Sequence, residues 1–450
     1  MSTSSATVRP ASRTAAMTSV VIAMLVSSMD STITNTTMPT IADELGGMSF
    51  YAWSFTSYMI FCTVLTPIAG RISDMFGRKT VYSVGLFVFL AGSLLCGFAD
   101  SMLSLVLYRA VQGIGAGLIT PIPMIIAGDL YPVEKRGKIQ ALFTGMWGLS
   151  AVLAPLVGSL FVETVGWRWI FWINIPLCLI AWALLFAYKE GYVPKRASVD
   201  VYGAALFTLG VSLLLSVTVV EPASLALVFA VCGLGFLAWF FFFERKHPSP
   251  VVPLSLFKIR PIRWMAFNLL LACAALFGTS SFVPLFLQDE GYSIFVSGLS
   301  LLGMSAGWML TAVPAGKWVL KYGYSRLIVI GNAILVVSGV MLLFLREGAG
   351  FAYVTTAMTV QGIAYGLLFT VTTIGAQQFV GPHDKGISTS LQMFVRNIGT
   401  SVGVTIMGGL LSRAGDDVPG GIANLFLYGA LMSALALLSA FGMRDPKPEA

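Results

Sequence analysis

Long apolar runs separated by short polar segments repeat along the whole chain. A helix that crosses a bilayer needs about twenty predominantly apolar residues. Runs of this kind predict helices at residues 17–37, 50–70, 80–98, 103–128, 139–162, 168–188, 201–220, 223–243, 264–287, 297–316, 326–345, 350–377, 386–411 and 423–443. The polar segments between these runs are too short for a soluble domain. The pattern therefore predicts an all-α membrane protein with fourteen transmembrane helices.

The composition agrees with a lipid environment. Hydrophobic residues make up 57% of the chain and charged residues only 10%, whereas soluble domains average about 25% charged residues. The net charge of +7 is spread over short loops and forms no single basic stripe, which argues against a nucleic-acid partner. The five cysteines have no metal-ligand spacing, and no phosphate-binding loop is present. We therefore expect no enzyme activity, no cofactor and no metal.

The basic residues also predict the orientation. With the N-terminus placed in the cytoplasm, 22 of the 27 Lys and Arg residues fall in cytoplasmic loops and tails. Only 3 fall outside, and 2 lie within predicted helices. Because cytoplasmic loops carry an excess of Lys and Arg, we expect a multi-pass protein of the plasma membrane with both termini in the cytoplasm. The first apolar run is too long for a signal-peptide core and is expected to be retained.

Two pairs of similar segments indicate an internal repeat. Gly70–Gly77 resembles Gly316–Gly323, and Val111–Gly117 resembles Val360–Gly366, at offsets of 246 and 249 residues. The repeat predicts two pseudo-symmetric six-helix bundles with an inserted helix pair between them. The expected boundaries are a cytoplasmic tail at 1–16, an N-terminal bundle at 17–188, a linker with the inserted helices at 189–263, a C-terminal bundle at 264–443 and a cytoplasmic tail at 444–450. Two related bundles around a central site suit transport by alternating access.

Asp30 is a solitary carboxylate within the first apolar run. A charge at this depth costs several kcal/mol, on the order of 3 or more, so such a group is expected to carry a proton, bind a cation or pair with a base. Arg109 lies within the run 103–128, and its guanidinium stays charged at ordinary pH. We predict an Asp30–Arg109 pair, formed directly or through Gln112 or water, that handles protons. A static ion pair that only joins two helices remains the alternative.

Several motifs resemble those of a known family. Gly70–Lys79 resembles the signature loop between helices 2 and 3 of the major facilitator superfamily, and Arg109–Gly117 resembles its helix 4 motif. Similarity to the fourteen-span drug:proton antiporters of that superfamily is carried by Met29–Pro39, Gly166–Pro176, Asp200–Gly203 and Arg396–Gly399. The resemblance covers nearly the whole chain and implies a transporter.

The resemblance also implies a conformational latch at the cytoplasmic side. Its predicted members are Gly70, Asp74, Gly77, Arg78 and Asp129. In the family this cluster holds the two bundles together in the outward-facing state. The alternative is that the basic residues of this loop only set the topology.

The run 139–162 resembles the glycine-rich helix 5 motif of the antiporters. Its predicted helix-packing residues are Gly145, Gly148, Pro155 and Gly158. Ala154 and Ser159 replace two glycines of the family pattern. Close packing without a role in the direction of transport therefore remains an alternative.

Polar and aromatic residues in the predicted helices are candidates for substrate binding. They are Asn35, Tyr58, Gln112, Trp147, Gln361, Phe394 and Arg396. Arg396 either attracts an anionic substrate or pairs with a carboxylate. For each aromatic residue taken singly, a place in the core or at the membrane interface is the simpler interpretation. Asp289 and Glu290 are expected either to form a proton-entry cluster or to be solvated loop charges.

Asp30 and the family resemblance together predict a proton-coupled multidrug efflux antiporter. Its expected partners are protons, the lipid bilayer and small amphipathic compounds that are cationic or neutral, and the chain is expected to act as a monomer. One alternative on the same fold is an exporter of a lipid or a lipid-linked glycan. A nutrient symporter and a receptor or scaffold that transports nothing also remain open.

Overall fold

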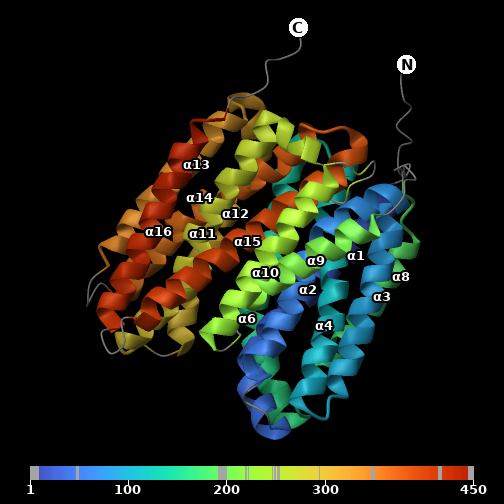
Figure 1. Cartoon of the computed structure of the whole chain (residues 1–450), viewed down its shortest axis with the longest axis vertical. Helices are drawn as coiled ribbons and strands as arrows, with labels where there is room; N and C mark the ends of the chain where they lie inside the picture. The colour runs from blue at the N-terminus through green and yellow to red at the C-terminus, as the bar shows by residue number, and fades with distance from the viewer. Residues whose placement is uncertain are drawn as a thin grey trace. The chain divides into compact units, whose positions relative to one another are not determined.

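The computed structural model of the chain describes residues 10–443 except 47–49, 191–199, 218–219, 221, 246, 248–249, 251–253, 293, 346–349 and 414–417. Every regular element in this part of the chain is a helix (Figure 1). The α-helices are α1 (Pro10–Leu45), α2 (Tyr51–Phe76), α3 (Arg78–Gly97), α4 (Met102–Ile119), α5 (Ile122–Leu130), α6 (Val133–Thr164), α7 (Trp169–Trp172), α8 (Asn174–Phe186), α9 (Val201–Ser216), α10 (Ala223–Glu244), α11 (Arg260–Asp289), α12 (Ile294–Tyr322), α13 (Tyr324–Leu343), α14 (Gly350–Gln378), α15 (Lys385–Arg413) and α16 (Val418–Ala440). Short 3-10 helices lie at Leu254–Lys258 and Pro382–Asp384.

Each apolar run contains one helix or two consecutive helices. The run 103–128 is divided between α4 and α5, with Pro121 at the break, because proline has no backbone N–H to donate. α1 begins at Pro10, so residues 10–16, expected to belong to the tail, are helical. Among the described residues, ten stretches are long and apolar enough to cross a membrane, and α9 is apolar but shorter. The protein is thus a multi-pass, all-helical membrane protein, and the number fourteen stays a prediction.

The helices form two compact units. Within the described residues, the first unit comprises those up to Leu130 together with Met146–Leu254 and Gly381–Leu391. The second comprises Tyr131–Gly145, Ser255–Val380 and the residues from Gln392 onward. The first turns of α6 therefore belong to the second unit and those of α15 to the first, which differs from the boundaries expected at 17–188 and 264–443.

Glycines explain why these first turns pack where they do. In the first unit, a methyl group on Gly70 would meet the carbonyl oxygen of Gly386 at the start of α15. In the second unit, a methyl group on Gly137 of α6 would come too close to the backbone nitrogen of Gly316 on α12. Both contacts depend on the absence of a side chain, because only glycine permits such close approach of two backbones.

The two units repeat the same helix packing. In the first, α2 packs on α4, and in the second, α12 packs on α14. A Cβ atom on Gly113 would meet the carbonyl oxygen of Tyr58, and one on Gly362 would meet that of Met304. Gly362 follows Gly113 by 249 residues, and Met304 follows Tyr58 by 246. These are the offsets of the sequence repeat, as expected for a duplicated unit.

Candidate functional site

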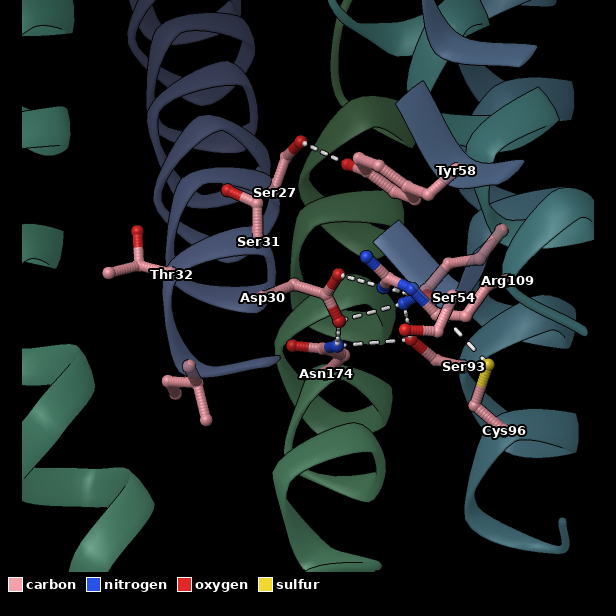
Figure 2. A network of polar contacts seen from close by, with 12 residues as sticks. Ser27, Asp30, Ser31, Thr32, Ser54, Tyr58, Ser93, Cys96, Arg109 and Asn174 are labelled. Carbon is pink, nitrogen blue, oxygen red and sulfur yellow. Dashed lines mark hydrogen bonds and ion pairs between the residues drawn. The ribbon is translucent and has the colours of Figure 1, made fainter. Parts of the chain in front are cut away.

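The candidate site is centred on Asp30 of α1, whose side chain is almost completely buried in the first unit. Hydroxyl groups near it bond back to the helix: Ser31 Oγ and Thr32 Oγ1 donate to the carbonyl oxygen of Ser28 at 3.1 and 2.9 Å. These neighbours are therefore satisfied within α1. The carboxylate of Asp30 turns away from its own helix toward α4 and α8 (Figure 2).

Three side chains donate to the Asp30 carboxylate. Arg109 Nη1 lies 2.7 Å from Oδ2, so the two residues form a direct ion pair. Gln112 Nε2 and Asn174 Nδ2 each donate to Oδ1 at 2.8 Å. Arg109 and Gln112 are one turn apart on α4, and Asn174 begins α8, so the site joins three helices. Charge-assisted hydrogen bonds of this kind are the strong ones, and they stabilise the ionised acid.

A further layer orients these donors. Ser93 Oγ of α3 accepts from Gln112 Nε2 at 2.6 Å and from Asn174 Nδ2 at 3.0 Å (Figure 2). Gln112 Oε1 accepts from Arg109 Nη1 at 2.6 Å and from Cys96 Sγ at 3.7 Å. The amide groups are thus held in fixed orientations, and the donors to Asp30 among the described residues are N–H groups.

Arg109 is fully buried, and its guanidinium lies 4.2 Å from the centre of the Tyr58 ring. The Tyr58 hydroxyl is 3.4 Å from Ser27 Oγ. Within the described part of the chain, Nε and Nη2 of Arg109 have no hydrogen-bond partner. Asp30 and the electron-rich ring face are therefore the groups that compensate this charge. If Asp30 took up a proton, the Arg109 cation would keep only neutral neighbours among the described residues, the Tyr58 ring and Gln112 Oε1.

The structure brings together only some of the predicted substrate-binding residues. Tyr58 and Gln112 lie beside Asp30, whereas the Trp147 side chain on α6 is 47% exposed and has no part in these contacts. Gln361, Phe394 and Arg396 belong to the second unit, where Phe394 and Arg396 are partly exposed on α15. The side chain of Asn35, on α1, lies outside the described residues.

The predicted latch residues are in contact within the first unit. Asp74 accepts hydrogen bonds from the backbone N–H groups of Gly386 and Ile387, at 3.1 and 2.8 Å. These N–H groups open α15, where a carboxylate also interacts favourably with the helix dipole. Arg78 forms ion pairs with Asp74 and, at 3.2 Å, with Asp129. Together these contacts tie the end of α2 to the start of α15.

Gly77 joins α2 to α3 with a φ angle of +95°. Residues with a side chain rarely adopt this conformation, so the turn requires glycine. The turn places the first N–H groups of α3 against a second carboxylate, that of Glu190.

Two further residues of this cluster, Glu190 and Lys385, were not predicted from the sequence. Glu190 accepts from the backbone N–H groups of Arg78 and Lys79, the latter at 3.2 Å. Burial raises the pKa of Glu190, and the N–H donors of these two residues partly oppose the shift. Lys385 lies 3.7 Å from Asp129. Both are charged residues beside apolar runs, and ordinary loop residues have the same pattern. The sequence therefore does not distinguish them from loop residues.

The predicted packing residues of α6 have varied surroundings. This helix runs without interruption from Val133 to Thr164. Gly158 is buried, while Gly145 and Gly148 are partly exposed. A Cβ on Gly145 would meet only the end of one flexible side chain, at 3.9 Å. The side chain of Pro155 lies outside the described residues.

The role of the acids at the end of α11, a proton-entry cluster or solvated loop charges, stays a prediction. The side chain of Asp289 lies outside the described residues, and Glu290 follows the helix and is partly exposed. The described residues also contain no group of three or more His, Cys, Asp or Glu side chains that could hold a metal ion.

Comparisons with known proteins identify the family of the chain. The Major Facilitator Superfamily matches residues 20–404 and 303–450 of the chain. "Multidrug transporter protein MdtP" of Bacillus subtilis is 32% identical over 414 residues, which cover 90% of this chain and 76% of that protein. "Multidrug efflux pump SdrM" of Staphylococcus aureus is 27% identical, and the match covers 93% of each chain.

Solved structures share the fold at low sequence identity. The human organic anion transporter MFSD10 superposes with a TM-score of 0.71 at 15% identity, covering 96% of this chain and 100% of that one. The proton:xylose symporter XylE superposes with a TM-score of 0.65 at 16% identity, covering 95% and 94%. The resemblance to the fourteen-span drug:proton antiporters stays a prediction. The resemblance to the superfamily is confirmed: the chain belongs to the Major Facilitator Superfamily, whose members are transporters rather than enzymes.

Proposed function

We propose that the protein is a proton-coupled antiporter that exports amphipathic, cationic or neutral compounds from the cell. The observation that carries the proposal is the buried Asp30 carboxylate, held by Arg109, Gln112 and Asn174 within helices of a membrane transporter fold. An ionisable group at such a position is by default a candidate for proton or ion transfer. Relatives named as multidrug transporters support the choice of cargo.

The contacts of Asp30 suggest how proton uptake is coupled to movement. As a carboxylate, Asp30 accepts from three donors on α4 and α8. A proton on Oδ1 or Oδ2 removes its charge, which weakens the ion pair with Arg109 and leaves one oxygen with a hydrogen to donate. The neutral and charged forms therefore favour different packings of α1 against α4 and α8. Alternating access follows if these packings face opposite sides of the membrane.

The energy available from this exchange is sufficient for export. One charge that crosses a membrane potential of about 100 mV gains about 2.3 kcal/mol. At about 1.4 kcal/mol per factor of ten, this supports roughly fortyfold accumulation per charge. The proposal includes fourteen spans, a monomer in the plasma membrane and cytoplasmic termini. Proton entry from outside then drives export outward across that membrane.

The test is transport by the purified protein in proteoliposomes, with the pH gradient and the membrane potential imposed separately. The variant Asp30→Asn keeps the shape of the side chain but cannot exchange a proton. We expect it to insert and fold normally and to lose dye efflux driven by the pH gradient. Asp43→Asn makes the same chemical change at an exposed position of the same helix and should transport at the wild-type rate.

Other outcomes would reject the proposal. Efflux by Asp30→Asn at the wild-type rate would remove this residue from coupling. Movement of labelled lipid in place of dye would identify a lipid exporter. Uptake of cargo along with protons would identify a symporter. If the flux of no compound depended on the pH gradient, the protein would be a receptor or scaffold.

A further inference from the structure

Arg396 is a charged side chain in the interior of α15, three turns from the start of the helix. The acids of the second unit lie elsewhere: α12 to α16 contain no Asp or Glu, and α11 contains one only at its last residue, Asp289. The other basic residues of these helices lie near helix ends. Arg396 therefore carries a positive charge that no carboxylate in the helix interiors of its own unit can balance.

The internal repeat shows what the second unit lacks. Gln112 Nε2 donates to Asp30 Oδ1 at 2.8 Å, and Gln361 Nε2 donates to Thr279 Oγ1 at the same distance. Both residues of the second contact follow their counterparts by 249 positions. The repeat has kept the glutamine contact and replaced the acid by a neutral hydroxyl. The position of Arg109 is Met358 in the second unit, so Arg396 is not its counterpart. The second unit thus has an arginine of its own at depth, without an acid like the one that balances Arg109 in the first.

Neutral groups surround the Arg396 guanidinium. It lies 5.0 Å from the centre of the Phe369 ring and is hydrogen-bonded to the side chain of Tyr365. Its contact with Asn397 Oδ1 is long, at 3.4 Å. Trp308 packs edge-on against the Tyr365 and Phe369 rings, with ring centres 4.5 and 5.6 Å apart. These groups hold and orient the guanidinium, but because they are neutral they do not balance its positive charge.

Two buried side chains of the same unit have polar atoms without a hydrogen-bond partner in the described part of the chain. Gln392, one turn before Arg396 on α15, is 1% exposed, and neither its Nε2 nor its Oε1 has a hydrogen-bond partner among the described residues. The same holds for Nε1 of Trp308, which is 9% exposed. Native proteins leave few such atoms unpaired, and each one calls for a specific explanation. A polar ligand in this region would supply the missing partners.

We infer that Arg396 and Tyr365 form a subsite for an anionic oxygen group, namely the carboxylate of an amphipathic aromatic compound. A guanidinium matches the planar shape of a carboxylate through two parallel hydrogen bonds. The rings of Tyr365, Phe369 and Trp308 suit the flat apolar body of such a compound. The inference rests on the proposed export function and extends its cargo from cationic and neutral compounds to carboxylates and zwitterions.

The test is binding of a matched pair of probes, 2-naphthoate and its neutral methyl ester, to the whole protein in nanodiscs of phosphatidylcholine. Isothermal titration gives a Kd for each probe, and the ratio of the two reports recognition of the charge. We expect the wild type to prefer the acid. Arg396→Gln should weaken binding of the acid by about ten- to a hundredfold and bring the ratio close to one.

Two further variants separate the charge from the fold. Arg396→Lys keeps the charge but loses the fork of donors, so it should restore part of the preference. Arg326→Gln removes a charge from an exposed position in the same unit and should leave the ratio unchanged. A wild type without preference for the acid, or an Arg396→Gln variant with the wild-type ratio, would overturn the inference.

Nanodiscs that contain phosphatidylglycerol distinguish a lipid phosphate from a free carboxylate. If the preference of the wild type disappears in them, the subsite holds a lipid headgroup and our assignment is wrong. Because this assay needs no gradient, it also separates the two proposals. A charge-dependent ratio without proton-driven efflux would reject the transport mechanism alone, whereas efflux of cationic dye without the ratio would reject the carboxylate subsite alone.

Discussion

Asn174 offers a direct test of how the protein controls the charge on Asp30. Its Nδ2 donates to Asp30 Oδ1 at 2.8 Å and to Ser93 Oγ at 3.0 Å. The variant Asn174→Ala removes the hydrogen bond to Asp30, so that Gln112 and Arg109 remain as donors to the carboxylate. Since the lost hydrogen bond stabilises the ionised form alone, the variant favours the protonated acid.

The size of the effect follows from the kind of hydrogen bond that is lost. A hydrogen bond to a charged group contributes about 1.5–3 kcal/mol, and about 1.4 kcal/mol corresponds to one pH unit. We therefore expect the pH dependence of transport by Asn174→Ala to move to higher pH by about one to two units. The upper limit applies if no water replaces the amide.

The measurement is the initial rate of dye efflux from proteoliposomes over a series of pH values at a constant pH difference. Asn332→Ala is a matched control, because Asn332 is fully buried in α13 and donates only to Asn268 and to a backbone carbonyl. Both variants lose a buried amide, but only Asn174→Ala should move the profile. An unmoved profile in a correctly folded Asn174→Ala variant would refute the idea that this amide tunes Asp30.

Two further predictions concern stability in detergent, measured as the midpoint of thermal unfolding. Gly362→Ala places a methyl group against the carbonyl oxygen of Met304 and should destabilise the protein by about 1–3 kcal/mol. Gly235→Ala, whose Cβ meets no atom within 4 Å, should be neutral or stabilising. Equal unfolding midpoints for the two variants would contradict the packing argument. Burial raises the pKa of Glu190 above its ordinary value of 4.5, so the folded state binds this proton more tightly than the unfolded state and stability falls as the pH rises above that value. Glu190→Gln should flatten this decline, and an unchanged slope would show that Glu190 does not cause it.

The sequence predicted most of the fold because lipid imposes simple rules. Long apolar runs, the distribution of Lys and Arg and the repeated motifs at Gly70 and Gly316 each depend on local composition. The helix boundaries were harder to predict: α1 extends back to Pro10 although Ser12, Arg13 and Thr14 precede the apolar run that begins at Met17. Polar residues at a helix end can satisfy their backbone groups within the helix as well as in water, so composition alone does not show where a helix begins.

The centre of the site was also predictable, whereas its support was not. Asp30 and Arg109 stand out because charges are rare in apolar runs, and each needs a partner. Asn174 and Ser93 are uncharged, and similar residues occur throughout the chain as ordinary members of helices. Their role depends on a three-dimensional arrangement that joins α3, α4 and α8. Asn174 belongs to the motif Gly166–Pro176, but a family motif does not say which of its residues faces the carboxylate.

The comparison between the repeats gives the Asp30 site a more specific meaning than burial alone. Each unit uses a glutamine on the equivalent helix, Gln112 and Gln361, to hold the residue at the position of Asp30 or Thr279. The neutral Thr279 contact shows that the same fold can form this junction without a charge. An acid that served only to join helices would therefore not be needed. At this junction the first unit nevertheless keeps an acid and a base, Asp30 and Arg109, where the second has the neutral Thr279 and Met358. Retention of the costly pair in one repeat is what a proton-handling role predicts, because an uncharged contact cannot change its charge during a transport cycle.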